Sequence, residues 1–183
     1  MKKFLATLAT AAFVVTASTS AFAAANPFSD IPFGHWAYNS VAEMALAGIV
    51  EGYDDATYRG DRNITRSEMA KMSANLLLKL SPKSTAEAQQ LIAELSGDKP
   101  ATRYEIALTA AKIYTKVHKG NPPAATENFK DVPENHFASK AVNLMRTTKI
   151  MEGYSDKTFR GDRNMTRYEA AAIIARLYKK LSD

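Results

Sequence analysis

Three arginines stand at equivalent positions, each directly after a threonine that is followed three residues later by a glutamate: Arg66, Arg103 and Arg167. A threonine and a glutamate at this spacing form a capping box, so each arginine is expected in the first turn of a helix. Free amides and the helix dipole favour an anion there, and a guanidinium adds a planar fork for a carboxylate. The spacing predicts three sites for an anionic ligand. The alternative is a salt bridge between repeats, for instance to Glu51 or Glu152.

The residues of the capping boxes are expected to be structural. In each box the threonine hydroxyl accepts from the glutamate amide, and the glutamate side chain accepts from the threonine amide. Asp30 and Asp131 precede a predicted helix and are expected to cap or brace the turn there. The six box residues are Thr65, Glu68, Thr102, Glu105, Thr166 and Glu169.

Four further residues are candidates for ligand contact. Trp36 is the only tryptophan, and its ring can either stack on a sugar or cap the core. Phe137 occupies the equivalent position and keeps the stacking area without the indole N–H. Gly52 and Gly153 are expected to be conformational, and a glycine also lets a ligand approach the backbone closely.

The remaining chemistry-bearing residues predict neither catalysis nor a metal or cofactor. The chain lacks cysteine and the HExxH and GxSxG patterns, so a non-catalytic protein is expected. His35 and His136 have no second ligand at metal spacing and are expected to pack where a helix begins. The acidic loops at 54–55 and 155–156 lack the calcium-ligand series. The formal net charge of +5 is interleaved with acids, which argues against nucleic acid and suits an anionic polymer.

The candidate residues lie in an internal repeat with a constant offset of 101 residues. F-S-D-I-P at 28–32 returns as F-K-D-V-P at 129–133, and E-G-Y at 51–53 returns at 152–154. Apolar residues at helical spacing from 37 to 48 and from 69 to 80 predict a helix, a loop and a second helix in the first copy. The second copy has the same pattern.

A reduced third unit lies between the two copies. Apolar residues at helical spacing follow the box at 102–105, and an amphipathic helix is predicted at 88–95. This unit lacks the F-x-D-x-P segment and the long loop. The sequence thus predicts an all-α fold with a first module at 28–81, a degenerate middle module at 84–119, a linker at 120–128 and a third module at 129–182.

Residues 1–23 predict a signal peptide and therefore export. Lys2 and Lys3 precede an apolar stretch that runs to about residue 15, and A-F-A at 21–23 fits a cleavage site. The stretch is too short to span a bilayer, and no later segment is predicted to be a transmembrane helix.

The two long copies resemble the S-layer homology (SLH) family. Its signature runs F-x-D-V-x-x-x-H/W-W-A, an apolar helix, G-I/V-x-G-Y/F-x-D-G-T-F-R, and I-T-R-A/Y-E before a second helix; residues 28–80 and 129–181 follow it nearly throughout. The middle module matches only in T-R-Y-E and its helix pair. The resemblance implies three SLH-type modules in a pseudo-threefold arrangement, with grooves between neighbouring modules that bind cell-wall glycopolymer.

The resemblance also implies a wall-associated protein of the periplasm or cell surface. The segment N-P-F-S-D-I-P and the R-G-D-R-N before the box are more similar to SLH regions of outer-membrane proteins that bind peptidoglycan. Peptidoglycan is therefore favoured over a secondary cell-wall polymer as the partner. The alternatives are a structural adaptor that recruits an envelope protein, and the truncated N-terminal anchor of a larger outer-membrane or S-layer protein.

Overall fold

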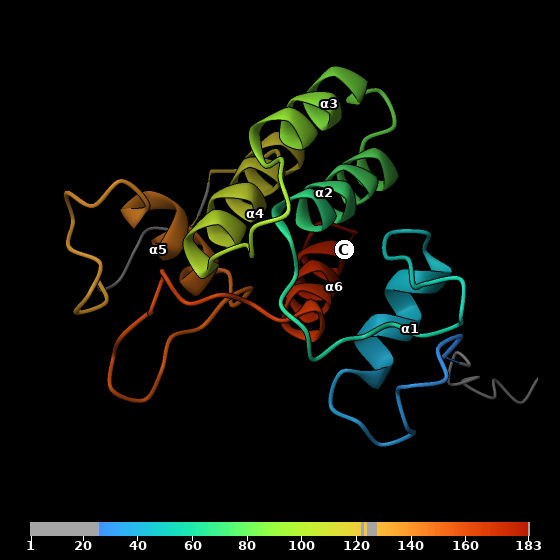
Figure 1. Ribbon diagram of the computed structural model, residues 1–183. Helices are drawn as coiled ribbons and strands as arrows, with labels where there is room; N and C mark the ends of the chain where they lie inside the picture. The colour runs from blue at the N-terminus through green and yellow to red at the C-terminus, as the bar shows by residue number, and fades with distance from the viewer. Residues whose placement is uncertain (1–25, 122, 124–127, 183) are drawn as a thin grey trace, which may run out of the picture.

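The computed structural model describes residues 26–121, 123 and 128–182, and helices make up the regular structure of this part (Figure 1). The predicted all-α class is confirmed. The predicted signal peptide and part of the linker lie outside the described residues. No helix in the described part is long and apolar enough to cross a bilayer. The helices are α1 (Tyr38–Leu46), α2 (Arg66–Leu80), α3 (Thr85–Glu94), α4 (Arg103–Val117), α5 (Ser139–Thr147) and α6 (Arg167–Ser182).

Helices α2, α4 and α6 each begin with a capping box. At α2, the Thr65 hydroxyl accepts from the Glu68 amide at 3.2 Å, and the Glu68 carboxylate accepts from the Thr65 amide at 2.9 Å. The same two bonds measure 3.3 and 2.9 Å at α4, and 3.2 and 2.9 Å at α6. Each box thus satisfies two amides at the start of a helix, where amides have no partner within the helix.

The residues just before the boxes join the three modules in a closed ring of backbone hydrogen bonds. The Ile64 amide donates to the Met165 carbonyl at 2.9 Å. The Met165 amide donates to the Ala101 carbonyl at 3.1 Å, and the Ala101 amide donates back to the Ile64 carbonyl at 2.8 Å. All three side chains are buried. Because each bond joins a different pair of modules, the ring holds all three together.

We call α2, α4 and α6 the central helices. The amides of their first two residues also donate to carbonyls of a neighbouring module. At the start of α6, the Arg167 amide donates to the Arg62 carbonyl and the Tyr168 amide donates to the Gly60 carbonyl, both at 3.0 Å. With the box, these bonds occupy the amides that a helix leaves unpaired in its first turn. The equivalent bonds of α2 and α4 run from Arg66 to Lys99, Ser67 to Gly97, Arg103 to Arg163 and Tyr104 to Gly161.

The helices pack mainly between modules. α1 lies against α6, α3 against α2, and α5 against α4, so the first helix of each module covers the second helix of a neighbour (Figure 1). The three second helices, α2, α4 and α6, also pack against one another. This cyclic order supports the pseudo-threefold relation of whole modules, which stays a prediction.

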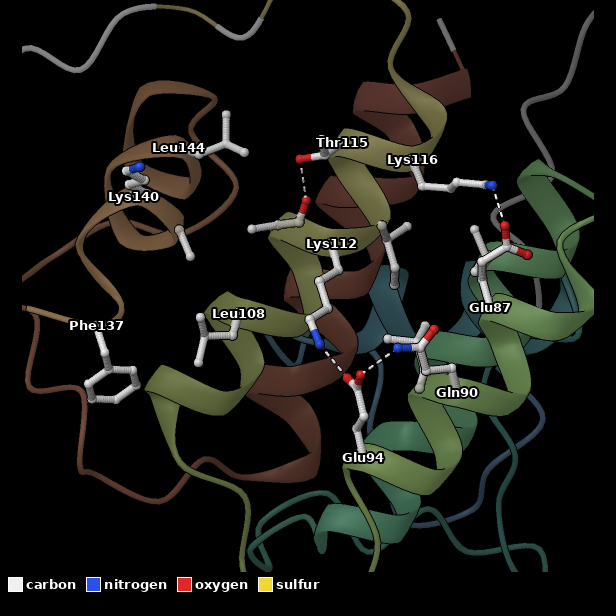
Figure 2. Close-up of a pocket in the computed structure, with 15 residues that line it drawn as sticks. Glu87, Gln90, Glu94, Leu108, Lys112, Thr115, Lys116, Phe137, Lys140 and Leu144 are labelled. Carbon is white, nitrogen blue, oxygen red and sulfur yellow. Dashed lines mark hydrogen bonds and ion pairs between the residues drawn. The ribbon is translucent and has the colours of Figure 1, made fainter.

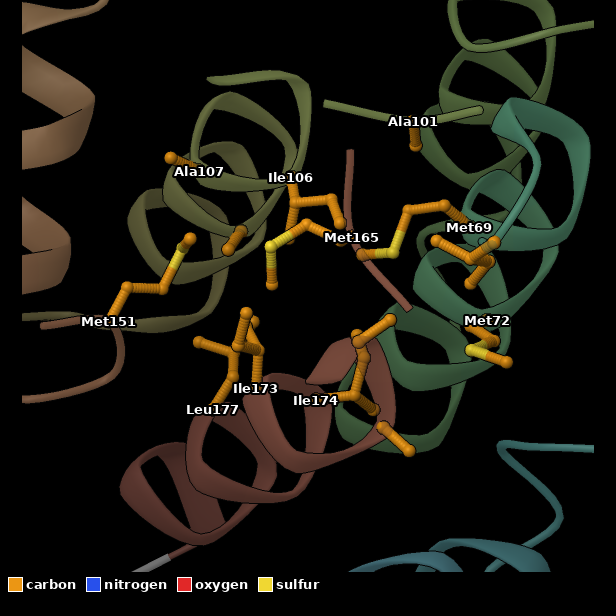
Figure 3. Packing of buried hydrophobic residues seen from close by; sticks show 14 of the residues in the cluster. Met69, Met72, Ala101, Ile106, Ala107, Met151, Met165, Ile173, Ile174 and Leu177 are labelled. Atoms are coloured by element: carbon orange, nitrogen blue, oxygen red, sulfur yellow. The ribbon is translucent and has the colours of Figure 1, made fainter. Parts of the chain in front are cut away.

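The core lies between the three central helices (Figure 3). Met69 and Met72 of α2, Ile106 of α4, and Ile173 and Ile174 of α6 are all buried. Their helical spacing gives each of these helices one apolar face, and the three faces meet. Full burial of an aliphatic side chain of this size contributes about 1.5–3 kcal/mol, so these contacts provide much of the stability.

The leading segments of the first and third modules (28–37 and 129–138) are fixed by their aspartates. Asp30 accepts from the Tyr58 and Arg59 amides, each at 2.7 Å. Asp131 makes the equivalent bonds in the third module at 2.8 and 2.7 Å. The N-cap of α1 is instead Ala37, which has no side-chain cap. The aspartates therefore brace the long loop between the two helices of their module, residues 47–65 in the first and 148–166 in the third, and do not cap a helix.

Gly161 is predicted to tolerate no side chain, because the Tyr104 ring lies directly on it. A Cβ at this position would stand 2.1 Å from the ring. We expect Gly161→Ala to lower the free energy of unfolding by about 1–3 kcal/mol, the usual cost of overpacking. Urea denaturation of the purified protein measures this loss.

A double-mutant cycle supplies the control. Ser67 of α2 stands where α4 has Tyr104, and nothing lies near the corresponding Cβ position of Gly97. In a Tyr104→Ser background, Gly161→Ala should therefore cost less than in the wild-type protein. An equal cost in both backgrounds would show that the ring does not limit this position.

Candidate functional site

Arg167 reaches from α6 into the first module. Its side chain is only 4% exposed. Nε donates to the Tyr58 carbonyl at 3.0 Å, Nη2 donates to the Glu51 carbonyl at 2.8 Å, and Nη1 pairs with Glu68 at 2.9 Å. The guanidinium carbon also lies 4.5 Å from the centroid of the Tyr58 ring. Arg167 thus clamps the long loop and the central helix of the first module to α6.

Arg103 forms the equivalent clamp between α4 and the third module. It is 7% exposed, and it donates to the carbonyls of Phe159 and Glu152, both at 2.9 Å. Burial lowers the pKa of Arg103, but an arginine stays charged within a protein. Two of the three arginines therefore join modules, but not through the predicted salt bridge to Glu51 or Glu152. They reach Glu51 and Glu152 through backbone carbonyls, and the carboxylates are not involved.

Arg66 differs because the middle module has no long loop to receive it. Its side chain is 33% exposed, and its Nε lies 3.1 Å from a Glu105 carboxylate oxygen. This Nε–H is not aligned for a hydrogen bond to any group in the described residues. Arg66 is therefore the most accessible of the three arginines.

The amides expected to attract an anion beside these arginines are occupied. Hydrogen bonds to neighbouring modules and the capping boxes use the first amides of α2, α4 and α6. The expectation of free helix amides was wrong, because each central helix begins inside an interface between modules. Ligand contact by Arg66, Arg103 and Arg167 stays a prediction that depends on the guanidinium groups.

The glutamates of the α2 and α6 boxes each accept from an arginine side chain. Glu68 accepts from Arg62 and Arg167. Burial raises the pKa of Glu68, but the hydrogen bonds from Arg62 and from the Thr65 amide and the charges of Arg167 and Arg62 lower it more, so the net shift is downward. For Glu169, burial again raises the pKa, and Arg163 together with a backbone amide reverses the shift. Both carboxylates are ionised at neutral pH, and the stability they contribute is lost only as the pH falls through their lowered pKa values.

Two polar grooves run beside these clamps, one on α6 and one on α2. The first has a volume of about 320 Å³ and the second about 140 Å³. We name them the α6 groove and the α2 groove. The α6 groove is lined in part by Trp36, Arg103, Glu152, Glu169, Ala172 and Arg176. The α2 groove is lined in part by Glu51, Gly52, Tyr53, Glu68, Lys71 and Arg167.

Trp36 lies at the surface, on the α6 groove. Trp36 is 61% exposed, and its ring and the Tyr168 ring meet edge to face with 6.0 Å between centroids. The alternative that Trp36 caps the core is therefore not what the structure shows. The α2 groove has no ring equivalent to that of Trp36. The middle module covers α2, and it lacks the leading segment that would supply this ring.

The two histidines pack where α1 and α5 begin. His35 lies on Tyr168 with 4.5 Å between ring centroids, and its Nδ1 accepts from the Ala37 amide at 3.3 Å. His136 accepts from the Ala138 amide in the same way at 3.2 Å. Within the described residues, no group of three or more ligating side chains is placed to hold a metal ion.

Phe137 lies on a different surface, an apolar groove of about 710 Å³ between α3, α4 and α5 (Figure 2). Its side chain is 73% exposed, and Leu108 and Leu144 line the same groove. The structure therefore does not bring Phe137 together with a clamping arginine. Ion pairs between α3 and α4 border the groove, from Lys112 to Glu94 and from Lys116 to Glu87.

Gly52 and Gly153 are required by packing. A Cβ at either position would stand 2.1 Å from a phenylalanine ring, that of Phe28 or Phe129. Gly52 lines the α2 groove, and Gly153 lines a separate pocket beside α5. Ligand contact by these glycines stays a prediction.

A short pattern in all three modules has no counterpart among the predictions above. G-D-R at 60–62 and at 161–163, and G-D-K at 97–99, stand at the same distance before each capping threonine. In each case the glycine and the basic residue supply the carbonyls that accept the amides of a neighbouring helix. Aligning the three boxes and comparing the residues before them would have revealed this pattern.

Arg167 and Arg66 are predicted to differ in their effect on stability. Arg167→Ala should lower the free energy of unfolding by about 3–5 kcal/mol, because it leaves the Tyr58 and Glu51 carbonyls without a donor. Arg66→Ala is the matched control at the same helix position, and loss of its partly exposed ion pair should cost about 0–1 kcal/mol. Urea denaturation measures both, and equal losses would contradict the clamp.

The S-layer homology domain model matches residues 27–70 and 128–171 of this chain. Outer membrane protein SlpA of Thermus thermophilus is 35% identical over 181 residues, which cover 96% of this chain and 18% of that protein. Outer membrane protein SlpA of Deinococcus radiodurans is 42% identical over 82 residues, covering 45% of this chain and 7% of that protein. The cellulosome-anchoring protein of Acetivibrio thermocellus is 25% identical over 149 residues, covering 81% and 25%.

These relatives are much longer than this chain, which spans a quarter of their length or less. The similarity to the Thermus thermophilus protein nevertheless covers nearly the whole chain, including the middle module. The two regions matched by the domain model contain both leading segments, both long loops and the starts of α2 and α6. Over residues 27–70 and 128–171, this chain belongs to the S-layer homology domain family.

Proposed function

We propose that this protein is a non-catalytic anchor of the cell envelope that binds a wall glycan in the grooves between its modules. Its family supports a place at the envelope, and the relatives named above include outer membrane proteins and a cellulosome-anchoring protein. The ligand we propose is peptidoglycan or an anionic glycopolymer linked to it. The proposed location is the periplasm or the cell surface, after export.

The observation that carries this proposal is the composition of the α6 groove. It combines an exposed indole, Trp36, with the exposed guanidinium of Arg176, and the buried Arg103 forms part of its wall. An aromatic face packs against the apolar face of a sugar ring, and a guanidinium pairs with the carboxylates of peptidoglycan stem peptides. In the described part of the chain, α6 is the only central helix whose groove has both a clamping arginine and an exposed ring from a neighbouring module.

The clamps also give the groove a fixed wall. Arg103 holds the Glu152 carbonyl at 2.9 Å, and Arg176 donates to the Ile150 carbonyl at 3.3 Å, so both ends of the Ile150–Glu152 segment are held. A wall that is ordered before binding reduces the entropy that a ligand must overcome. Buried arginines can therefore support binding without contacting the glycan.

Trp36→Ala is expected to weaken binding to purified wall sacculi about threefold to tenfold, the loss expected for one aromatic contact. Co-sedimentation of the purified protein with sacculi measures the affinity. Phe33→Ala is the matched control, because Phe33 is an exposed aromatic residue of the same leading segment that lines neither polar groove. This control should bind like the wild-type protein.

Sacculi before and after acid extraction of secondary polymers separate the two ligands. Binding that survives extraction supports peptidoglycan, and binding lost on extraction supports the secondary polymer. Failure of the wild-type protein to sediment with either preparation would reject the proposed function.

A further inference from the structure

A second pocket in the third module adjoins the α6 groove. It has a volume of about 320 Å³ and shares Glu152 with that groove. It lies between the end of α5 and the long loop of the third module. Three of its lining residues are basic: Arg146, Lys149 and Lys157. We name it the basic pocket.

The first module has no such cluster, although the repeat provides every equivalent position. The residues 101 positions earlier are Ala45, Gly48 and Ala56. The last turn of α1 has no basic residue, whereas that of α5 contains Arg146. Two copies with the same backbone pattern therefore differ by three positive charges at one place.

The backbone holds the two lysines at the rim. Lys149 follows α5 with a φ of 60°, and its amide donates to the Arg146 carbonyl at 2.9 Å. Lys157 has a φ of 65°, and its amide donates to the Tyr154 carbonyl at 3.0 Å. The first module has Gly48 at the position of Lys149, with a φ of 72°. Lysine is thus present at a left-handed position that glycine suits better.

Lys149 and Lys157 differ from several other lysines in their ion pairing. In the described part of the chain, neither lysine forms an ion pair, although Lys71, Lys112 and Lys116 all do. Arg146 lies over the Phe129 ring at 4.7 Å and forms one side of the pocket. The pocket therefore contains three basic side chains and one carboxylate, that of Glu152, and has an excess of positive charge beside the α6 groove.

We infer that the basic pocket binds a phosphate group of the polymer that occupies the α6 groove. Lysine ammonium groups act as point charges, which suit phosphate, and two lysines that form no ion pair within the described residues favour a phosphate over a singly charged carboxylate. This inference rests on the proposed function, and it specifies a phosphate-bearing wall polymer as the ligand class. Because the first module lacks the three basic residues, we expect the phosphate group to bind at the third module and not at the first.

Titration of the purified protein with inorganic phosphate, followed by NMR of its amides, tests the pocket directly. Phosphate should cause saturable shifts at Lys149, Gly153 and Lys157, and acetate at equal ionic strength should not. The double variant Lys149→Gly, Lys157→Ala restores the residues of the first module. It should weaken phosphate binding at least tenfold without lowering the melting temperature, because glycine suits the left-handed φ at 149.

The control is Lys179→Ala, Lys180→Ala, which removes the same charge from the exposed end of α6. This control should keep phosphate binding. Equal weakening in both double variants, or equal shifts with acetate and phosphate, would overturn a phosphate pocket.

Sacculi and lipid vesicles identify the source of the phosphate. The wild-type protein should bind sacculi that carry phosphate-bearing polymer more tightly than the Lys149→Gly, Lys157→Ala variant does. If the variant binds sacculi as tightly as the wild-type protein, this inference is rejected and the proposed function stands. If the wild-type protein does not bind sacculi, the proposed function is rejected. If the protein binds phosphatidylglycerol vesicles at least as tightly as sacculi, and this binding needs Lys149 and Lys157, the phosphate is that of a lipid and not that of a wall polymer.

Discussion

An α-helix cannot satisfy the amides of its own first turn, and this constraint organises the whole protein. At α2, α4 and α6 the partners come from a capping box and from carbonyls of a neighbouring module. The ring through Ile64, Ala101 and Met165 places the three helix starts together. The apolar faces of the same helices then meet behind the ring and form the core. Each module consequently supplies the hydrogen-bond partners and the packing surface that the central helix of a neighbouring module needs.

The same constraint shapes the candidate site. Because the helix starts lie inside interfaces, Arg103 and Arg167 point into the neighbouring module and hold its long loop by the backbone. The polar grooves form where such a loop lies beside a central helix. The middle module has no long loop, so Arg66 is left with a single partly exposed ion pair. Differences between the copies, such as Trp36 and the basic pocket, are then expected to decide which groove binds most strongly.

Much of this architecture could be predicted from local patterns. The capping boxes and the helices after them follow from residue spacing, since each depends on neighbours within one helical turn. The pairing of α1 with α6 could not be predicted, because it depends on contacts between segments far apart in the chain. The amides beside Arg66, Arg103 and Arg167 were expected to be free, because their partners also come from distant segments of the chain. Asp30 was expected near a helix start, but it accepts from amides 28 and 29 residues further along.

Hydrogen exchange at the amides of Ile64, Ala101 and Met165 is the most direct test of the ring. If the ring joins the three modules into one cooperative unit, all three amides should exchange only through global unfolding. Their free energies of opening, measured by native-state exchange in rising denaturant, should then be equal and match the free energy of unfolding. An Ala101 amide that opens at clearly lower free energy than the other two would show that the middle module detaches alone, and would contradict this account.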